Sequence, residues 1–224
     1  MARIARLVVP GHPHHVTQRG VRRMKTFMDD EDYIKYISMI HKSCQKAGTE
    51  VWAYCLMPNH VHFIMVPTDE DGLRASLGEA HRQYTRMINF REGCRGHLWQ
   101  ERFHSFPMDE SYLMACARYV ELNPVRAGLV KRPEDWAWSS AQAHLKGKDD
   151  ELVIVQPMLN RFPEWGMFLE GGIKMEEQKN LQLHTRTGRP LGEDKWVLGL
   201  ENKTGRALKR KPVGRPKKRN SDRK

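Results

Sequence analysis

Cysteine is scarce in this sequence and is never closely paired. The chain of 224 residues contains four cysteines, Cys44, Cys55, Cys94 and Cys116, and none of them forms a C-x-x-C pair. This spacing argues against a structural zinc site and supplies no disulfide framework. We therefore expect a protein of the reducing cytoplasm.

The sequence also lacks a long hydrophobic run. No apolar stretch approaches the roughly 18 residues that a membrane-spanning helix requires. The apolar run near the N-terminus, in MARIARLVVPGHPHH, is too short for the hydrophobic region of a signal peptide. We expect a soluble protein that does not use a membrane.

Acidic side chains are sparse only in the last part of the chain. Residues 173–224 hold 16 basic and 6 acidic side chains, whereas residues 1–172 hold 22 and 21. The net charge of +11 therefore comes almost entirely from a C-terminal basic arm. Such an arm binds polyanions by neutralising phosphates and releasing counterions, so nucleic acid is the expected partner. The predicted contacts in this arm are Arg189, Lys209, Arg210, Lys211, Arg215, Lys217, Lys218 and Arg219.

Two histidines stand at the start of the apolar run in MPNHVHFIMVP. His60 and His62 precede Phe63–Val66, a segment typical of a buried strand. Residues i and i+2 of a strand point to the same face and lie about 7 Å apart, so both imidazoles can converge on one metal ion or phosphate. The bland alternative is a pair of hydrogen-bonded core histidines, and spacing alone does not decide between them.

The order of the predicted elements is strand, helix, strand, strand, helix, strand. This order predicts an α+β ferredoxin-like fold, with a four-stranded antiparallel sheet and helices on one face. His12, His14 and His15 are interpreted mainly as a polar lead-in to the first strand, because Pro10, Gly11 and Pro13 lie among them. The predicted elements are strand 14–19, a helix from 29 or 30 to 47, strand 50–56, a strand from His60, helix 72–90 and strand 98–106.

A further helix is predicted over Ser111–Asn123, which ends before Pro124. Tyr119 and Asn123 would lie at i, i+4 on one face of it. If that face meets His60 and His62, two imidazoles and one amide oxygen form a three-ligand site for a divalent ion, with a tyrosine nucleophile beside it. The alternatives are an ordinary packing tyrosine and a helix-ending asparagine.

The remaining sequence suggests three parts. Residues 1–145 form the main domain, closed by Trp136 and Trp138 as core anchors. Residues 146–205 form a loop-rich extension with a small helix near 193–203. Residues 206–224 are polar, cationic and interrupted by proline, so we expect a DNA-binding tail that is disordered when free.

Several motifs in order resemble one known family. MPNHVHFIMVP resembles the histidine–hydrophobe–histidine signature of the HUH endonuclease superfamily, and RYVELNPVRAGLV resembles the tyrosine helix of its single-tyrosine transposases. HVTQRG, HLWQERFHS and WAWSSAQAH are similar to that family in order and spacing, so the resemblance covers about residues 10–145. ELNPVRAG, TGRPLG and VGRPKK are more narrowly similar to REP-associated tyrosine transposases.

This resemblance implies a chemistry and a substrate. His60 and His62 are expected to bind Mg²⁺ or Mn²⁺, and Tyr119 to attack single-stranded DNA, giving a 5′-phosphotyrosine link and a free 3′-OH. Related transposases often place a glutamine ligand where this chain has Asn123, which offers the same amide oxygen on a shorter stem. The expected substrates are palindromic DNA hairpins. The reaction is expected to need no nucleotide cofactor, and the protein is expected to act as a monomer or homodimer. Independently of the resemblance, Arg19, Arg102 and Arg126 are candidates for phosphate contacts, with ordinary surface charge as the alternative.

Two other functions fit the same sequence features. A ferredoxin-like sheet with exposed aromatic residues can bind single-stranded nucleic acid by stacking, without catalysis. A metal-dependent hydrolase would instead use an activated water and form no covalent adduct. Only the transposase hypothesis predicts a covalent protein–DNA adduct, whereas the hydrolase would cleave DNA without an adduct and the binding module would not cleave it.

The basic tail generates a first testable prediction. Truncation at Arg206 is expected to flatten the dependence of hairpin binding on salt. Each lost phosphate contact makes the negative slope of log K against log[salt] shallower by about 0.7–0.9. Fluorescence anisotropy from 50 to 300 mM salt measures this slope. An unchanged slope would show that the tail makes no phosphate contacts.

Overall fold

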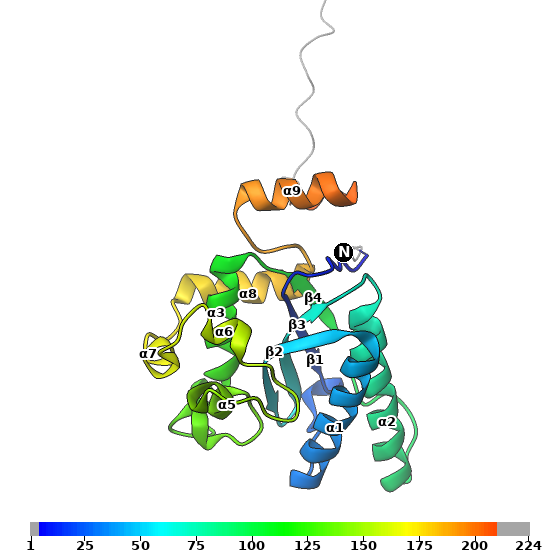
Figure 1. Cartoon of the computed structure of the whole chain (residues 1–224). Coiled ribbons are helices and arrows are strands. Elements are labelled where there is room, and N and C mark those ends of the chain that lie inside the picture. Colours follow the sequence, from blue (N-terminus) through cyan, green and yellow to red (C-terminus); the bar gives the residue numbers. More distant parts are fainter. Residues whose placement is uncertain (1–4, 210–224) are drawn as a thin grey trace, which may run out of the picture.

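The computed structural model describes residues 5–209 (Figure 1). The tail residues Arg210, Lys211, Arg215, Lys217, Lys218 and Arg219 lie outside this range. The strands are β1 His14–Arg19, β2 Thr49–Met57, β3 His60–Pro67 and β4 His104–Pro107. The helices are α1 Asp30–Ala47, α2 Glu79–Arg91, α3 Glu110–Glu121, α4 Asn123–Arg126, α5 Ala141–Lys146, α6 Gln156–Leu159, α7 Trp165–Glu170, α8 Met175–Thr187 and α9 Asp194–Thr204.

The four strands form one antiparallel sheet in the order β2-β3-β1-β4. β2 and β3 are a hairpin that turns at Pro58 and Asn59, and β1 lies against β3 with Arg19 opposite His60. This arrangement confirms the predicted ferredoxin-like fold class. It also places the start of β3 beside the end of β1.

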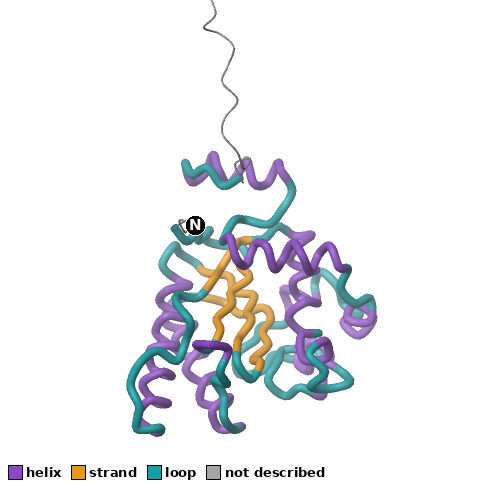
Figure 2. The backbone as a smooth tube through the Cα atoms, turned by 180° about the vertical axis from the view of Figure 1, so that it is seen from behind, coloured by secondary structure: helices purple, strands orange, loops and turns teal. Residues whose placement is uncertain are grey.

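Alternate residues of β3 belong to two different cores, one on each face of the sheet. Val61, Phe63 and Met65 pack with α1 and α2, whereas Ile64 packs with α3. The strands accordingly lie between two groups of helices (Figure 2). Helices α1 and α2 cover one face as predicted, and the tyrosine-bearing α3 covers the face that carries His60 and His62.

The ends of α1 follow from its local sequence. The side chain of Asp29 accepts a hydrogen bond from the backbone N–H of Asp32 and caps the first turn. Gly48 ends the helix in the left-handed conformation, with φ of 57°, which glycine adopts without a steric penalty. Both boundaries match the sequence prediction.

The fourth strand is shorter than predicted. Leu98–Phe103 is not a strand, and Trp99 makes only an isolated bridge to Gly20. Glu101 has φ of 59°, which an extended strand does not allow. The alternating pattern there reflects the burial of Trp99 and Phe103 in the core, and β4 begins only at His104.

Two helix predictions are confirmed with local differences. The helix predicted over 72–90 is helical from residue 72 to residue 91 and contains a π-helical turn at Arg74–Gly78 before α2. α3 ends at Glu121, and Pro124 then stands in the first turn of α4, where its missing N–H costs no hydrogen bond. Short helices α6 and α7 occupy the segment described as loop-rich, and α8 was not predicted. No helix within residues 5–209 combines the length and apolar character that crossing a membrane demands.

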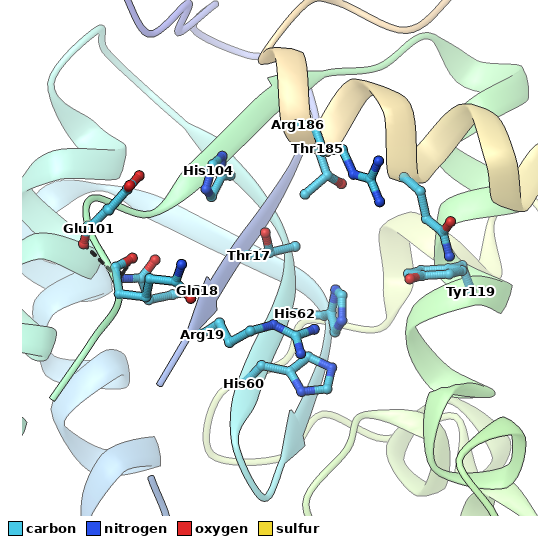
Figure 3. Close-up of a pocket in the computed structure, with 12 residues that line it drawn as sticks. Thr17, Gln18, Arg19, His60, His62, Glu101, His104, Tyr119, Thr185 and Arg186 are labelled. Carbon is cyan, nitrogen blue, oxygen red and sulfur yellow. Dashed lines mark hydrogen bonds between the residues drawn. The ribbon is translucent and has the colours of Figure 1, made fainter. Parts of the chain in front are cut away.

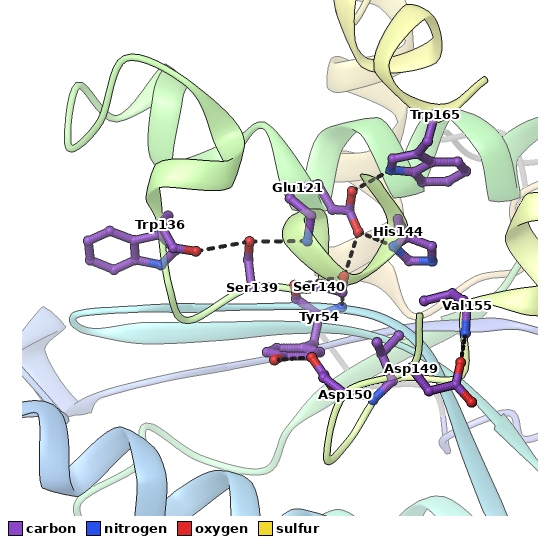
Figure 4. A network of polar contacts seen from close by, with 12 residues as sticks. Tyr54, Glu121, Trp136, Ser139, Ser140, His144, Asp149, Asp150, Val155 and Trp165 are labelled. Carbon is purple, nitrogen blue, oxygen red and sulfur yellow. Dashed lines mark hydrogen bonds and ion pairs between the residues drawn. The ribbon is translucent and has the colours of Figure 1, made fainter. Parts of the chain in front are cut away.

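A buried carboxylate fixes α3 to its neighbours (Figure 4). Glu121, which has no exposed surface, accepts hydrogen bonds from Ser140 Oγ at 2.5 Å, His144 Nδ1 at 2.6 Å and Trp165 Nε1 at 2.8 Å. Ser140 also accepts from the backbone N–H of Tyr54 on β2. This network ties α3 to the sheet, to α5 and to α7.

The network generates a stability prediction. In Glu121→Gln an NH₂ group replaces one of the two acceptor oxygens and faces a hydrogen-bond donor. We therefore expect the free energy of unfolding to fall by about 1–3 kcal/mol. Urea denaturation measures the change. The matched control is Glu110→Gln on the same helix, whose exposed ion pair with Arg161 should contribute less than about 0.5–1 kcal/mol. Equal losses in the two variants would contradict the assigned role of Glu121.

Candidate active site

A cavity of 460 Å³ lies where the end of β1 and the start of β3 meet α3 and α8 (Figure 3). Its lining combines imidazole, phenol, amide and guanidinium groups. The lining residues are Thr17, Gln18, Arg19, His60, His62, Gln100, Glu101, His104, Tyr119, Gln182, Thr185 and Arg186.

His60 and His62 share one face of β3, as residues two apart in a strand must. Their ring centroids are 5.0 Å apart with an interplanar angle of 79°. His60 pairs in register with Arg19, and the arginine side chain extends toward both imidazoles (Figure 3). The two histidines therefore present one site at the mouth of the β2–β3 hairpin.

Both imidazoles are held in the neutral form. Burial lowers the pKa of His60 to about 3, with a further contribution from the charge of Arg19. Burial lowers the pKa of His62 well below its usual range, and the neighbouring His60, His15, Arg19 and Arg126 act in the same direction. A neutral imidazole is the form that binds a metal ion.

One nitrogen of each ring is already used. His60 Nδ1 lies 2.6 Å from Asn59 Oδ1, to which it donates, and His62 Nδ1 lies 3.0 Å from His15 Nε2. Among the described residues no hydrogen bond is made by either Nε2. Nε2 is therefore the ring nitrogen without a hydrogen-bond partner in both histidines, and both histidines line the cavity.

Tyr119 reaches this site from α3. Its ring meets His62 edge-on, with centroids 5.5 Å apart and an angle of 82°, and meets His15 at 6.1 Å. The guanidinium of Arg126 lies over the Tyr119 ring, 4.7 Å from its centroid. The structure thus brings Tyr119 together with His60 and His62.

Asn123 is placed differently from the other three residues. It opens α4 rather than continuing α3, and it is not among the residues that line the cavity. Its Nδ2 is buried without a hydrogen-bond partner within residues 5–209. The amide is therefore an unsatisfied polar group, one turn beyond Tyr119 along the chain.

The donor set fits a divalent cation only in part. Two neutral imidazoles with available Nε2 atoms are suitable ligands. No cluster of three or more His, Cys, Asp or Glu side chains suited to a metal occurs in the described part of the chain. A third protein ligand would have to be of another type, such as an amide oxygen. In Asn123 the atom without a partner among the described residues is the donor Nδ2, and this residue does not line the cavity.

The predicted phosphate contacts occupy different places. Arg19 lines the cavity, whereas Arg102 lines a neighbouring cleft with Arg6 and Arg186. Arg189 donates to the backbone carbonyls of Leu208 and Lys209, and Lys209 pairs with Asp194 at 3.0 Å. Arg189 and Lys209 therefore lie away from the cavity.

Sequence reasoning missed His15 and helix α8 as parts of the site. His15 is 1 % exposed and bonds to His62, so its interpretation as a polar lead-in is wrong. His14 is also buried, but its bonds are to the backbone of Val9 and His12. The sequence signal that could have identified His15 is its position inside the predicted strand 14–19, next to the β-branched residues Val16 and Thr17. Gln182, Thr185 and Arg186 come from α8, whose polar sequence gave no sign that it covers a site.

Comparison with known proteins identifies the family. A model described as "Transposase IS200 like" matches residues 9–123, just over half of the chain. A protein of Haemophilus influenzae assigned as a REP-associated tyrosine transposase is 27% identical over 138 residues, covering 56% of this chain and 77% of the relative. The REP-associated tyrosine transposase of Escherichia coli is 29% identical over 94 residues, covering 41% and 53%.

A solved structure supports the fold. It is that of a REP-associated tyrosine transposase bound to a REP hairpin, with a TM-score of 0.57 and 22% sequence identity, covering 67% of this chain and 90% of the other. The family model and the two relatives confirm the resemblance found in the sequence. The chain belongs to the IS200-like transposases, and REP-associated tyrosine transposases are among its relatives.

Proposed function

We propose that this chain cleaves and rejoins single-stranded DNA at folded palindromic elements, with Tyr119 as nucleophile and Mg²⁺ or Mn²⁺ as cofactor. The observation that carries the proposal is the edge-on approach of Tyr119 to His62, 5.5 Å between ring centroids, in a cavity that Arg19 also lines. A structural neighbour bound to a REP hairpin supports the substrate class.

The reaction is a transfer of one phosphodiester bond. Tyr119 Oη attacks the phosphorus, the bond to the 3′ oxygen breaks, and the 5′ phosphate becomes linked to the tyrosine. The phenolic proton passes to solvent, and the departing 3′ oxygen takes up a proton. Because the phosphotyrosine link retains the phosphodiester energy, a DNA 3′-OH can reverse the step without a nucleotide cofactor.

The side chains of the site have separate roles in binding the cation and the phosphate. His60 and His62 would hold the cation through Nε2, with the Asn123 amide as the candidate third ligand. When bound, the cation supplies Lewis-acid polarisation of the phosphate. Arg19 binds the phosphate oxygens, and the cation–π contact of Arg126 with the Tyr119 ring holds that ring in position.

The fold bears on the non-catalytic alternative. Stacking of bases on a ferredoxin-like sheet needs an open sheet face. Here α1 and α2 cover one face, while α3 and α8 pack on the other. The covered sheet favours a reaction in the cavity over binding on the sheet.

Removal of the nucleophile gives a direct test. Tyr119→Phe keeps the ring but lacks the attacking oxygen, so the covalent adduct with a labelled hairpin oligonucleotide and Mn²⁺ should disappear. Denaturing gel electrophoresis measures the adduct. Tyr112→Phe on the same helix is the matched control and should form normal adduct. Cleavage that persists in Tyr119→Phe would overturn the nucleophile assignment and favour an activated water.

Removal of a ligand tests the metal site. His62→Ala should lower cleavage by about 100-fold or more, the scale on which loss of one electrostatic stabiliser acts. Hairpin binding should stay close to that of the unmodified chain, because Arg19 and the basic arm remain. His97→Ala, at an exposed loop position, controls for histidine loss. Unfolding of His62→Ala would instead indicate a core role for this histidine.

A further inference from the structure

His62 makes its hydrogen bond to another histidine. His15 Nε2 on β1 lies 3.0 Å from His62 Nδ1, and the two rings are nearly parallel, with an interplanar angle of 4°. Both residues are buried, at 1 % and 6 % exposure. His15 is in turn held edge-on against Phe106 at 5.3 Å and Tyr119 at 6.1 Å. Its ring therefore has a fixed position between the strand and the tyrosine helix.

The hydrogen bond between the two rings contains one proton. The ring that carries this proton determines whether His62 Nε2 has a lone pair or a proton. If His62 Nδ1 donates, His62 Nε2 carries a lone pair. If His15 Nε2 donates, a neutral His62 carries its proton on Nε2 and cannot bind a cation there. The direction of this one hydrogen bond thus decides between a ligand and a donor.

We propose that His15 is a positioning residue that accepts the Nδ1 proton of His62, and so presents His62 Nε2 as a ligand to the divalent cation. The inference rests on the proposed metal-dependent function. It assigns to β1 a role like that of the acceptors that commonly hold the second nitrogen of metal-binding histidines. No carboxylate is needed for this role, because a neutral imidazole is itself an acceptor.

A second observation concerns the far side of His15. Its Nδ1 is buried without a hydrogen-bond partner among the described residues. When His15 Nε2 accepts, this Nδ1 carries a buried, unpaired N–H; when His15 Nε2 donates, it carries an unpaired lone pair. Both states leave one unsatisfied group, so the protein alone does not strongly fix the proton. Binding of a cation to His62 Nε2 would then select the first state.

Substitutions separate this role from simple packing. His15→Leu removes the acceptor, and we expect Mn²⁺ affinity to fall by about 10–100-fold, the range seen for loss of a ligand's hydrogen-bond partner. His15→Gln can place an amide oxygen near the lost Nε2 and should recover much of that affinity. Mn²⁺ titration followed by electron paramagnetic resonance measures binding without any turnover.

A buried histidine elsewhere supplies the matched control. His81 on α2 is 8 % exposed and bonds to the Tyr36 hydroxyl at 2.8 Å, in the core on the opposite face of the sheet. His81→Leu removes a comparable ring and hydrogen bond but should leave Mn²⁺ affinity within about twofold of the unmodified chain. If His15→Leu and His81→Leu bind Mn²⁺ equally well, the inference is wrong.

Spectroscopy of the unmodified chain provides the test that needs no substitution. Long-range ¹⁵N–¹H correlation spectra distinguish the two neutral forms of histidine. With Mg²⁺ present, His62 should carry its proton on Nδ1, and a proton on Nε2 would overturn the inference even if His15→Leu fails to fold. Failure of the unmodified chain to bind Mn²⁺ at all would instead defeat the metal in the proposed function, which is a separate outcome.

Discussion

The carboxylate of Glu121 is the interaction on which the geometry of the site depends. It lies two residues after Tyr119, and successive residues of a helix are rotated by about 100°, so the two side chains leave α3 on different sides. Three donors hold the carboxylate toward α5, α7 and the segment beside β2. With that side of the helix fixed, the phenol of Tyr119 is directed toward β3. A buried acidic group that lost its donors would be costly, so the helix has little freedom to rotate.

The sheet supplies the other half of the site through register. Pairing of β1 with β3 places Arg19 opposite His60 and Thr17 opposite His62. A shift of one residue in this register would turn both histidines to the opposite core. The hairpin turn at Pro58 and Asn59 also provides the partner of His60 Nδ1. The strand pairing therefore sets the position of both imidazoles, and the bond to Asn59 leaves Nε2 of His60 available.

Much of this arrangement could be predicted from sequence, because its signals are local. The apolar run of the histidine strand, the cap at Asp29 and the glycine at position 48 each act within a few residues. The parts that failed depend on distant partners. Glu121 is buried only because Ser140, His144 and Trp165 arrive from later in the chain, and the strand predicted from Leu98 is interrupted by the backbone of Glu101. Helix α8 is polar along most of its length, and its one buried residue, Leu181, packs in a core supplied by the sheet and α3, which are distant in sequence.

In the proposed reaction, Tyr119 becomes covalently linked to DNA beside His60 and His62. The most direct measurement is mass spectrometry of the protein after reaction with a hairpin oligonucleotide and Mn²⁺, followed by nuclease and protease digestion. We expect a nucleotide attached through its 5′ phosphate to the peptide that contains Tyr119. A link through a 3′ phosphate, a link at another residue, or cleaved DNA with no modified peptide would contradict it.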